Sequence, residues 1–258
     1  MGFWSGVCSV VSSACSVISS VASSIGNSVV KSATSIASLG VSLAAKVTDA
    51  IRSVGVSLGI IRPEDSLAEL GEKAILSEKK PEDFDSINEY IDHLNNNVPF
   101  DKDKFDRLDE KELLARSSIG ASITLKGINE KLDTVVTPEF MATVASQELE
   151  TKEIVSTIKA YKENDLKLED YDLYLNDELT LDETTKHSSA LVEAYQAVGG
   201  IFKDKTDFDA EEVTVIWQTI NVEHACHYCV PAHTGIAKMM KVDDAIIEAL
   251  RNETPLES

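Results

Sequence analysis

The first 61 residues place an apolar side chain every three or four positions, with serines between them. This period is typical of an amphipathic helix. The apolar positions that follow it are Val7, Val10, Val11, Ala14, Val17, Ile18, Val21 and Ile25. Thirty residues precede the first charge, Lys31, and a helix of that length would measure roughly 45 Å. Because glycine weakens a helix interior, we expect breaks or bends at Gly26-Asn27 and at Gly40.

Three roles are open for residues 1–61. The helical length would suffice to cross a bilayer, but the serines make a poor lipid-facing surface. Small residues instead suit close contact between helices, which favours self-association or binding to a partner helix. A low-complexity targeting tail is the third interpretation. Cys8 and Cys15 lie seven positions apart on one helix face and are expected to act as small apolar fillers.

From Pro63 to about Lys186 the helical spacing of apolar residues continues in an acidic background. Four helices are expected here: one from Pro63-Glu64, one from Phe84 to Asn97, one from about Asp103 through Leu114 with a bend near Gly120, and one from Thr137-Pro138 through Tyr161. Thr137 is a good N-cap, and Pro138 suits the first helical position. No alternating strand pattern of convincing length occurs, so the region is predicted to be all-α.

The C-terminal region continues the helical pattern. Helices are expected over residues 187–202, from Val213 to Ile220, and from Asp243 to about Arg251. Asp209 and Glu212 have the spacing of a capping box, which would start the second of these helices.

Charge divides the chain near Arg62-Pro63. The net charge is −20, yet residues 1–61 carry +2 and the remainder carries −22. We therefore predict three regions, 1–61, 62–186 and 187–258, in an all-α, multi-helix chain. Nucleic-acid binding is not expected, because phosphate contacts need clustered Lys and Arg. No basic segment precedes the N-terminal apolar run, so no signal peptide is predicted.

Reactive side chains gather between Val222 and His233. This stretch holds two cysteines, three histidines and Glu223. Since the chain has only four cysteines, a C-x-x-C pair is typical of redox or metal chemistry in a reducing compartment, and a cytoplasmic location is predicted. On a helix from Cys226 to Lys238, Cys226, Cys229 and His233 would share one face.

Pro231 would lie in the first turn of that helix, so the cysteines would lie at or beside its N-terminus. There the helix dipole and free N–H groups favour a thiolate, and a nearby imidazole can take the proton. The spacing also permits a disulfide, as reversible two-electron redox chemistry requires. Structural zinc, and a static disulfide or pair of buried thiols, are the alternatives. His224 and His227 are expected to be exposed residues at the helix end.

The motif in this stretch is Glu223-x-x-Cys226-x-Tyr228-Cys229-x-x-Ala232-His233-Thr234, followed by Ala237-Lys238 and an acidic helix start. It resembles the AhpD-like / carboxymuconolactone decarboxylase family over about residues 188–255. The resemblance implies an all-helical, oligomeric fold and alkylhydroperoxidase-type activity without a bound cofactor or metal. Family members continue with further helices after the motif, so the corresponding packing would come from residues 63–186, from another subunit, or not at all. In the last case the motif would be a remnant on a protein with another function.

The resemblance also implies roles for individual residues. Cys229 would attack the peroxide, and Cys226 would resolve the resulting sulfenic acid to a disulfide. His233 would deprotonate Cys229, and a carboxylate, Glu223 or Glu212, would complete a proton relay. A thiol donor such as a lipoylated or thioredoxin-like protein would then reduce the disulfide.

A second class of function is also open. The uncharged N-terminal stretch and the abrupt charge boundary would suit a membrane-active or secreted effector-like helical protein, or an assembly protein. In that interpretation residues 1–61 insert, associate with membranes or self-associate, and the cysteine motif only stabilises a pair of helices.

Overall fold

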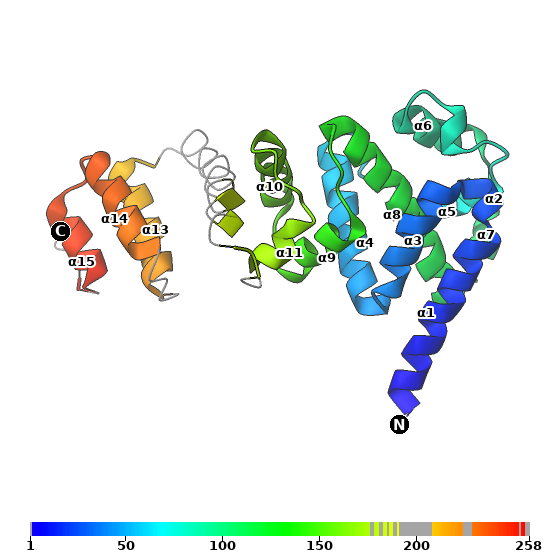
Figure 1. The fold of residues 1–258 in the computed structure, drawn as a ribbon, viewed down its shortest axis with the longest axis horizontal. Helices are drawn as coiled ribbons and strands as arrows, with labels where there is room; N and C mark the ends of the chain where they lie inside the picture. The colour runs from blue at the N-terminus through cyan, green and yellow to red at the C-terminus, as the bar shows by residue number, and fades with distance from the viewer. Residues whose placement is uncertain are drawn as a thin grey trace. The chain divides into compact units, whose positions relative to one another are not determined.

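The structure is a computed structural model that describes residues 2–175, 178–180, 183–184, 186–187, 190, 208–223, 229–252 and 254–255. Over these residues it contains helices and no strand, which confirms the predicted all-α, multi-helix fold (Figure 1). The chain forms two compact units, residues 1–198 and residues 199–258.

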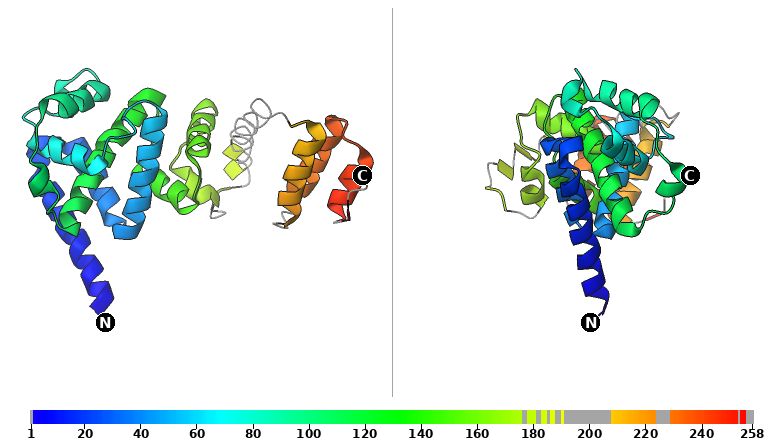
Figure 2. Two further views of the ribbon diagram at one scale, coloured as in Figure 1. Left: turned by 180° about the vertical axis from the view of Figure 1, so that it is seen from behind. Right: turned by 90° about the vertical axis from the view of Figure 1, so that its right-hand side faces the viewer.

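Four helices make up the N-terminal segment: α1 (Gly2–Ser20), α2 (Ala22–Ile25), α3 (Asn27–Ser38) and α4 (Val41–Ser57). The predicted breaks at Gly26 and Gly40 are confirmed. Their φ angles are +81° and +85°, a region that residues with a Cβ rarely adopt. The first turns of α1 extend beyond the other helices of this unit (Figure 2). No helix in the described part of the chain is long and apolar enough to cross a membrane.

The acidic region that follows is helical throughout residues 67–175, apart from short connections. Its elements are α5 (Leu67–Leu76), the 3-10 helix η1 (Pro81–Asp83), α6 (Ile87–Asn97), α7 (Lys102–Phe105), α8 (Glu110–Leu132), α9 (Pro138–Ser146), α10 (Thr151–Glu163) and α11 (Asp170–Leu175). The predicted start of α9 is confirmed, because Thr137 Oγ1 accepts a hydrogen bond from the Phe140 N–H at 3.2 Å and Pro138 is the first helical residue.

Four predicted helix boundaries in this region are wrong, and local caps explain three of them. The first helix begins at Leu67 rather than Pro63, because Ser66 Oγ accepts a hydrogen bond from the Glu69 N–H. The second helix begins at Ile87 rather than Phe84, because Ser86 Oγ accepts a hydrogen bond from the Glu89 N–H. The helix expected from Asp103 is divided into α7 and α8, because Asp109 and Glu112 form a capping box that starts α8. The helix expected to run through Tyr161 is interrupted between α9 and α10, where Glu148 has a φ of +57°.

Helix α8 is the central helix of the first unit. Helices α1, α3, α4, α5 and α6 all pack against it, so residues from both sides of the Arg62-Pro63 charge boundary share one core (Figures 1 and 2).

The predicted bend at Gly120 does not occur, since α8 continues through this residue. Gly120 instead lies where α8 meets α5: a Cβ built on it would be 1.9 Å from the Leu67 carbonyl oxygen. Gly71 of α5 is equally close to the Arg116 carbonyl oxygen of α8, at 2.0 Å.

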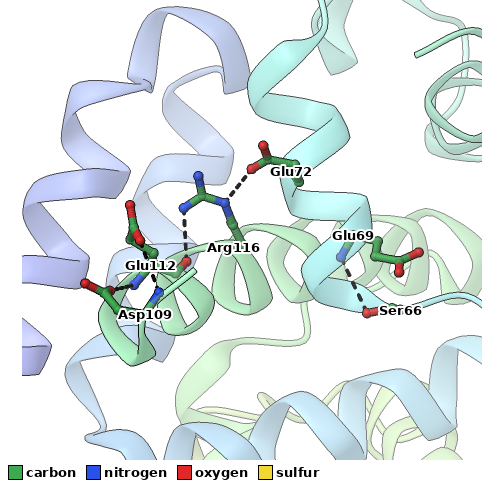
Figure 3. A network of polar contacts seen from close by, with 6 residues as sticks. All are labelled: Ser66, Glu69, Glu72, Asp109, Glu112 and Arg116. Carbon is green, nitrogen blue, oxygen red and sulfur yellow. Dashed lines mark hydrogen bonds and ion pairs between the residues drawn. The ribbon is translucent and has the colours of Figure 1, made fainter. Parts of the chain in front are cut away.

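A partly buried ion pair accompanies this contact between α5 and α8 (Figure 3). The Arg116 guanidinium pairs with the Glu72 carboxylate, and its Nη1 also donates to the Glu112 carbonyl oxygen at 3.2 Å. The two paired side chains are only 13% and 17% exposed. Solvent therefore screens this pair less than the exposed pairs elsewhere on the unit, and the pair helps to orient the two helices.

The described end of the first unit is an aromatic cluster around His187. This side chain is buried, its Nδ1 lies 2.8 Å from the Tyr161 hydroxyl, and its ring stacks on Tyr174. Burial lowers the pKa of His187, although the carboxylates of Asp170 and Glu183 act in the opposite direction. The helix predicted over residues 187–202 otherwise lies largely outside the described residues.

The second unit contains the helices α13 (Ala210–Glu223), α14 (Cys229–Met239) and α15 (Asp244–Arg251), which all contact one another. The capping box predicted for Asp209 and Glu212 is confirmed, with both backbone-to-carboxylate bonds at 2.9 Å. Asp243 caps α15 by accepting from the Ala245 N–H at 2.8 Å. The buried apolar residues recorded between these helices are Ala237, Val242 and Ile247, so the apolar core of the described part is small.

We predict that Gly120→Ala destabilises the first unit. The atom that the new methyl group would meet is a backbone oxygen, so α5 and α8 would have to move apart. The free energy of unfolding should fall by about 1–3 kcal/mol. Urea unfolding followed by circular dichroism would measure this change.

Gly235→Ala is the matched control, because a Cβ built at this helical glycine has no described neighbour within 4 Å beyond its adjacent residues and its own helix backbone. It should leave stability unchanged or raise it by up to about 1 kcal/mol through helix propensity. An unchanged unfolding curve for Gly120→Ala would contradict the close contact between α5 and α8.

Candidate active site

The described part of helix α14 runs from Cys229 to Met239. Pro231 is the third residue of this range, and its place in the first turn of the helix stays a prediction, as does the place of Cys229 at the positive end of the helix dipole. Residues 224–228, which include Cys226, His224 and His227, lie outside the described residues.

His233 lies on α14 four positions after Cys229, and this spacing brings both residues to one face of the helix. The His233 ring stacks on Trp217 of α13, with ring centroids 5.3 Å apart and an interplanar angle of 24°. The histidine is half-buried in this position. Burial lowers the pKa of His233 below its ordinary value of 6.5. This shift favours the neutral imidazole, the form that can accept a proton.

The two candidate carboxylates lie at opposite ends of α13. Glu223 is the last residue of this helix, is exposed, and precedes the segment that leads to Cys229. Glu212 lies in the first turn, eleven positions earlier, or about 16 Å along the axis. Its carboxylate accepts a hydrogen bond from the Asp209 N–H in the capping box. The structure therefore brings Glu223, and not Glu212, to the end of α13 from which the chain leads to Cys229.

The face that α13 buries is polar. Thr214, Gln218 and Asn221 are buried at positions i, i+4 and i+7, whereas Ile220 is exposed. The apolar run from Val213 to Ile220 predicts this helix without showing which of its faces is covered. Gln218 inside this apolar run was the signal in the sequence that could have pointed to a buried polar residue.

Gln218 connects this buried face to α14. It is 0% exposed, and its Nε2 donates to the Val230 carbonyl oxygen at 3.2 Å and to Thr234 Oγ1 at 2.9 Å. Thr234 Oγ1 in turn donates to the same carbonyl oxygen at 2.8 Å. The Gln218 Oε1 accepts a hydrogen bond from Asn221 Nδ2 at 3.4 Å. A small hydrogen-bonded network thus joins α13 to the first turns of α14.

A zinc site is one of the alternatives for the cysteine motif. Among the described residues no group of three or more His, Cys, Asp or Glu side chains is arranged to hold a metal ion. Cys226 belongs to the part of the chain outside that description, so the zinc alternative stays a hypothesis for this motif.

We predict that Trp217→Ala raises the pKa of His233 towards 6.5. The substitution uncovers one face of the imidazole, and hydration stabilises its protonated form. A proton NMR titration of the histidine rings measures the shift, and a His233→Gln variant assigns the resonance. Trp217→Phe should shift the pKa less, because a ring still covers the imidazole. A larger shift with phenylalanine than with alanine would contradict the role of stacking.

Comparison with known proteins assigns no family to this chain. No family model, curated protein or solved structure matches it.

Proposed function

We propose that the chain reduces hydroperoxides, or exchanges disulfides, by thiol chemistry at Cys229 and Cys226. The observation that supports this proposal most is the first half of α14. The described part of this helix starts with Cys229, and a half-buried histidine, whose pKa is lowered by burial, follows one turn later. A thiol at a helix N-terminus beside a proton acceptor has the environment of a reactive cysteine.

In the proposed reaction His233 takes the proton of the Cys229 thiol. The thiolate sulfur attacks one peroxide oxygen, the O–O bond breaks, and the other oxygen leaves as an alcohol after it gains a proton. Cys229 is then a sulfenic acid. The Cys226 thiol attacks its sulfur, an S–S bond forms, and water leaves. The two thiols have supplied the two electrons that convert the peroxide to alcohol and water.

We assign the carboxylate of the proton relay to Glu223. This residue ends α13 next to the segment that leads to Cys229, while the Glu212 carboxylate accepts a hydrogen bond from the cap of the same helix. An external dithiol, such as a lipoylated or thioredoxin-like protein, would return the disulfide to two thiols. No bound cofactor is needed for this cycle.

We also propose that the second unit works as an oligomer. Its described helices bury few apolar side chains, while Ile236 and Met239 of α14 and Met240, which follows the helix, are exposed. An exposed apolar face of this kind is typical of a protein–protein contact. A second copy of the chain would supply the packing that the family resemblance leads us to expect.

We predict that Cys229→Ser abolishes peroxide reduction with a dithiol donor, because serine is not a redox-active nucleophile at neutral pH. His233→Gln should lower the rate at pH 7 by about 10²-fold, since the general base is lost. One equivalent of peroxide should remove two free thiols from the unsubstituted chain, and mass spectrometry should map them to Cys226 and Cys229.

Cys15→Ser is the control. Cys15 belongs to the first unit, is half-buried, and its Sγ lies 3.7 Å from Ser38 Oγ. This variant should keep the parental rate. Full activity of Cys229→Ser, or no activity of the unsubstituted chain with any dithiol donor, would contradict the proposed function.

A further inference from the structure

We propose that Gln218 is a positioning residue that holds the turn carrying Cys229 and His233 in its reactive conformation. This inference rests on the proposed function and adds a residue that the cysteine motif does not contain. Gln218 belongs to α13, lies eleven positions before Cys229, and is completely buried. A buried carboxamide must satisfy its hydrogen bonds within the protein, so the partners of Gln218 are structurally constrained.

The carboxamide nitrogen of Gln218 donates to the two residues that directly follow the proposed reactive ones. Val230 follows Cys229, and Thr234 follows His233. The carboxamide nitrogen donates to the Val230 carbonyl oxygen at 3.2 Å and to Thr234 Oγ1 at 2.9 Å. The Thr234 hydroxyl closes the network by donating to the same carbonyl at 2.8 Å. The turn between Cys229 and His233 is therefore tied to α13 at both of its ends.

Asn221 sets the orientation of the Gln218 carboxamide. Its Nδ2 donates to Gln218 Oε1 at 3.4 Å, which leaves the amino group directed at α14. Both residues are buried on the same face of α13. In this orientation the Gln218 amino group faces α14. It can therefore donate hydrogen bonds to the Val230 carbonyl oxygen and to the Thr234 hydroxyl oxygen, both of which are acceptors.

A neighbouring contact adds to the alignment of the two helices. Trp217 stacks on His233, and Gln218 donates to Thr234, so two consecutive residues of α13 contact two consecutive residues of α14. A shift of α14 by one residue would break both contacts. The small apolar core recorded in this unit would not by itself specify the register so strictly, because apolar contacts are non-directional.

The first turn of a helix is where such support has most effect. The N–H groups of a first turn have no acceptors within the helix, and helix ends fray readily. In the proposed function the dipole of α14 favours a thiolate at Cys229, and it can do so only while this turn stays helical. Loss of the Gln218 bonds should therefore raise the pKa of the Cys229 thiol and reduce its reactivity at neutral pH.

The test measures the reactivity of the Cys229 thiol directly. In the full-length chain Cys8, Cys15 and Cys226 are replaced by serine, and the rate of alkylation by iodoacetamide is followed from pH 5 to pH 10. Gln218→Met removes the hydrogen bonds with little change in volume, and Thr219→Met is the control at the adjacent, exposed position of α13. Thr234→Val removes the hydroxyl group, and Thr234→Ser retains it.

We expect Gln218→Met to move the alkylation profile to higher pH and to slow alkylation at pH 7 about two- to fivefold. Thr234→Val should shift the profile in the same direction, whereas Thr234→Ser and Thr219→Met should follow the parent. Circular dichroism and thermal unfolding establish that each variant is folded. If Gln218→Met does not fold, the comparison of Thr234→Val with Thr234→Ser decides the outcome.

Two results would overturn the inference. One is a parental alkylation profile for folded Gln218→Met and Thr234→Val, and the other is an equal shift for Thr219→Met. Alkylation requires no peroxide, so this experiment is separate from the test of the proposed function. A chain that reduces no peroxide but shows the expected shift would refute the peroxidase proposal and leave the role of Gln218 in place.

Discussion

The close approach of α5 and α8 is the constraint on which the first unit depends. A Cβ built at Gly120 would meet the backbone of α5, and one built at Gly71 would meet the backbone of α8. The absence of side chains at these two positions lets the helices touch through their main chains. The other faces of α8 are then available to α1, α3 and α4, and small residues such as Ala121 and Ser122 let these helices pack closely. The acidic region and the nearly uncharged N-terminal segment thus share one core.

The second unit is held together in a different way. The described helices bury few apolar side chains, so hydrogen bonds carry more of the specificity of their packing. Thr214, Gln218 and Asn221 form a polar stripe on the covered face of α13, and Gln218 reaches the backbone of α14. Directional contacts of this kind suit a reactive helix start, because they specify the position of a turn rather than only its burial.

The chemistry proposed for this unit depends on two effects that act on neighbouring turns of α14. A helix N-terminus at Cys229 would stabilise a negative charge there, and partial burial lowers the pKa of His233, which favours the neutral imidazole that can accept a proton. Each effect is modest alone. Together they favour transfer of a proton from sulfur to imidazole, which is the step that makes a thiol nucleophilic.

The sequence by itself determined the all-α class, the glycine breaks at residues 26 and 40, and the caps at Thr137 and Asp209, because periodicity, backbone freedom and capping are local properties. It also pointed to Cys229 and His233, whose spacing along one helix is local too. Which residues face each other across two helices is a property of the tertiary structure. Only that structure decided that Gly120 marks a helix contact instead of a bend, that Glu212 lies at the far end of α13 from Glu223, and that Gln218 is buried against α14. These facts depend on which helices pack against each other, and the pattern of residues along the sequence does not show this.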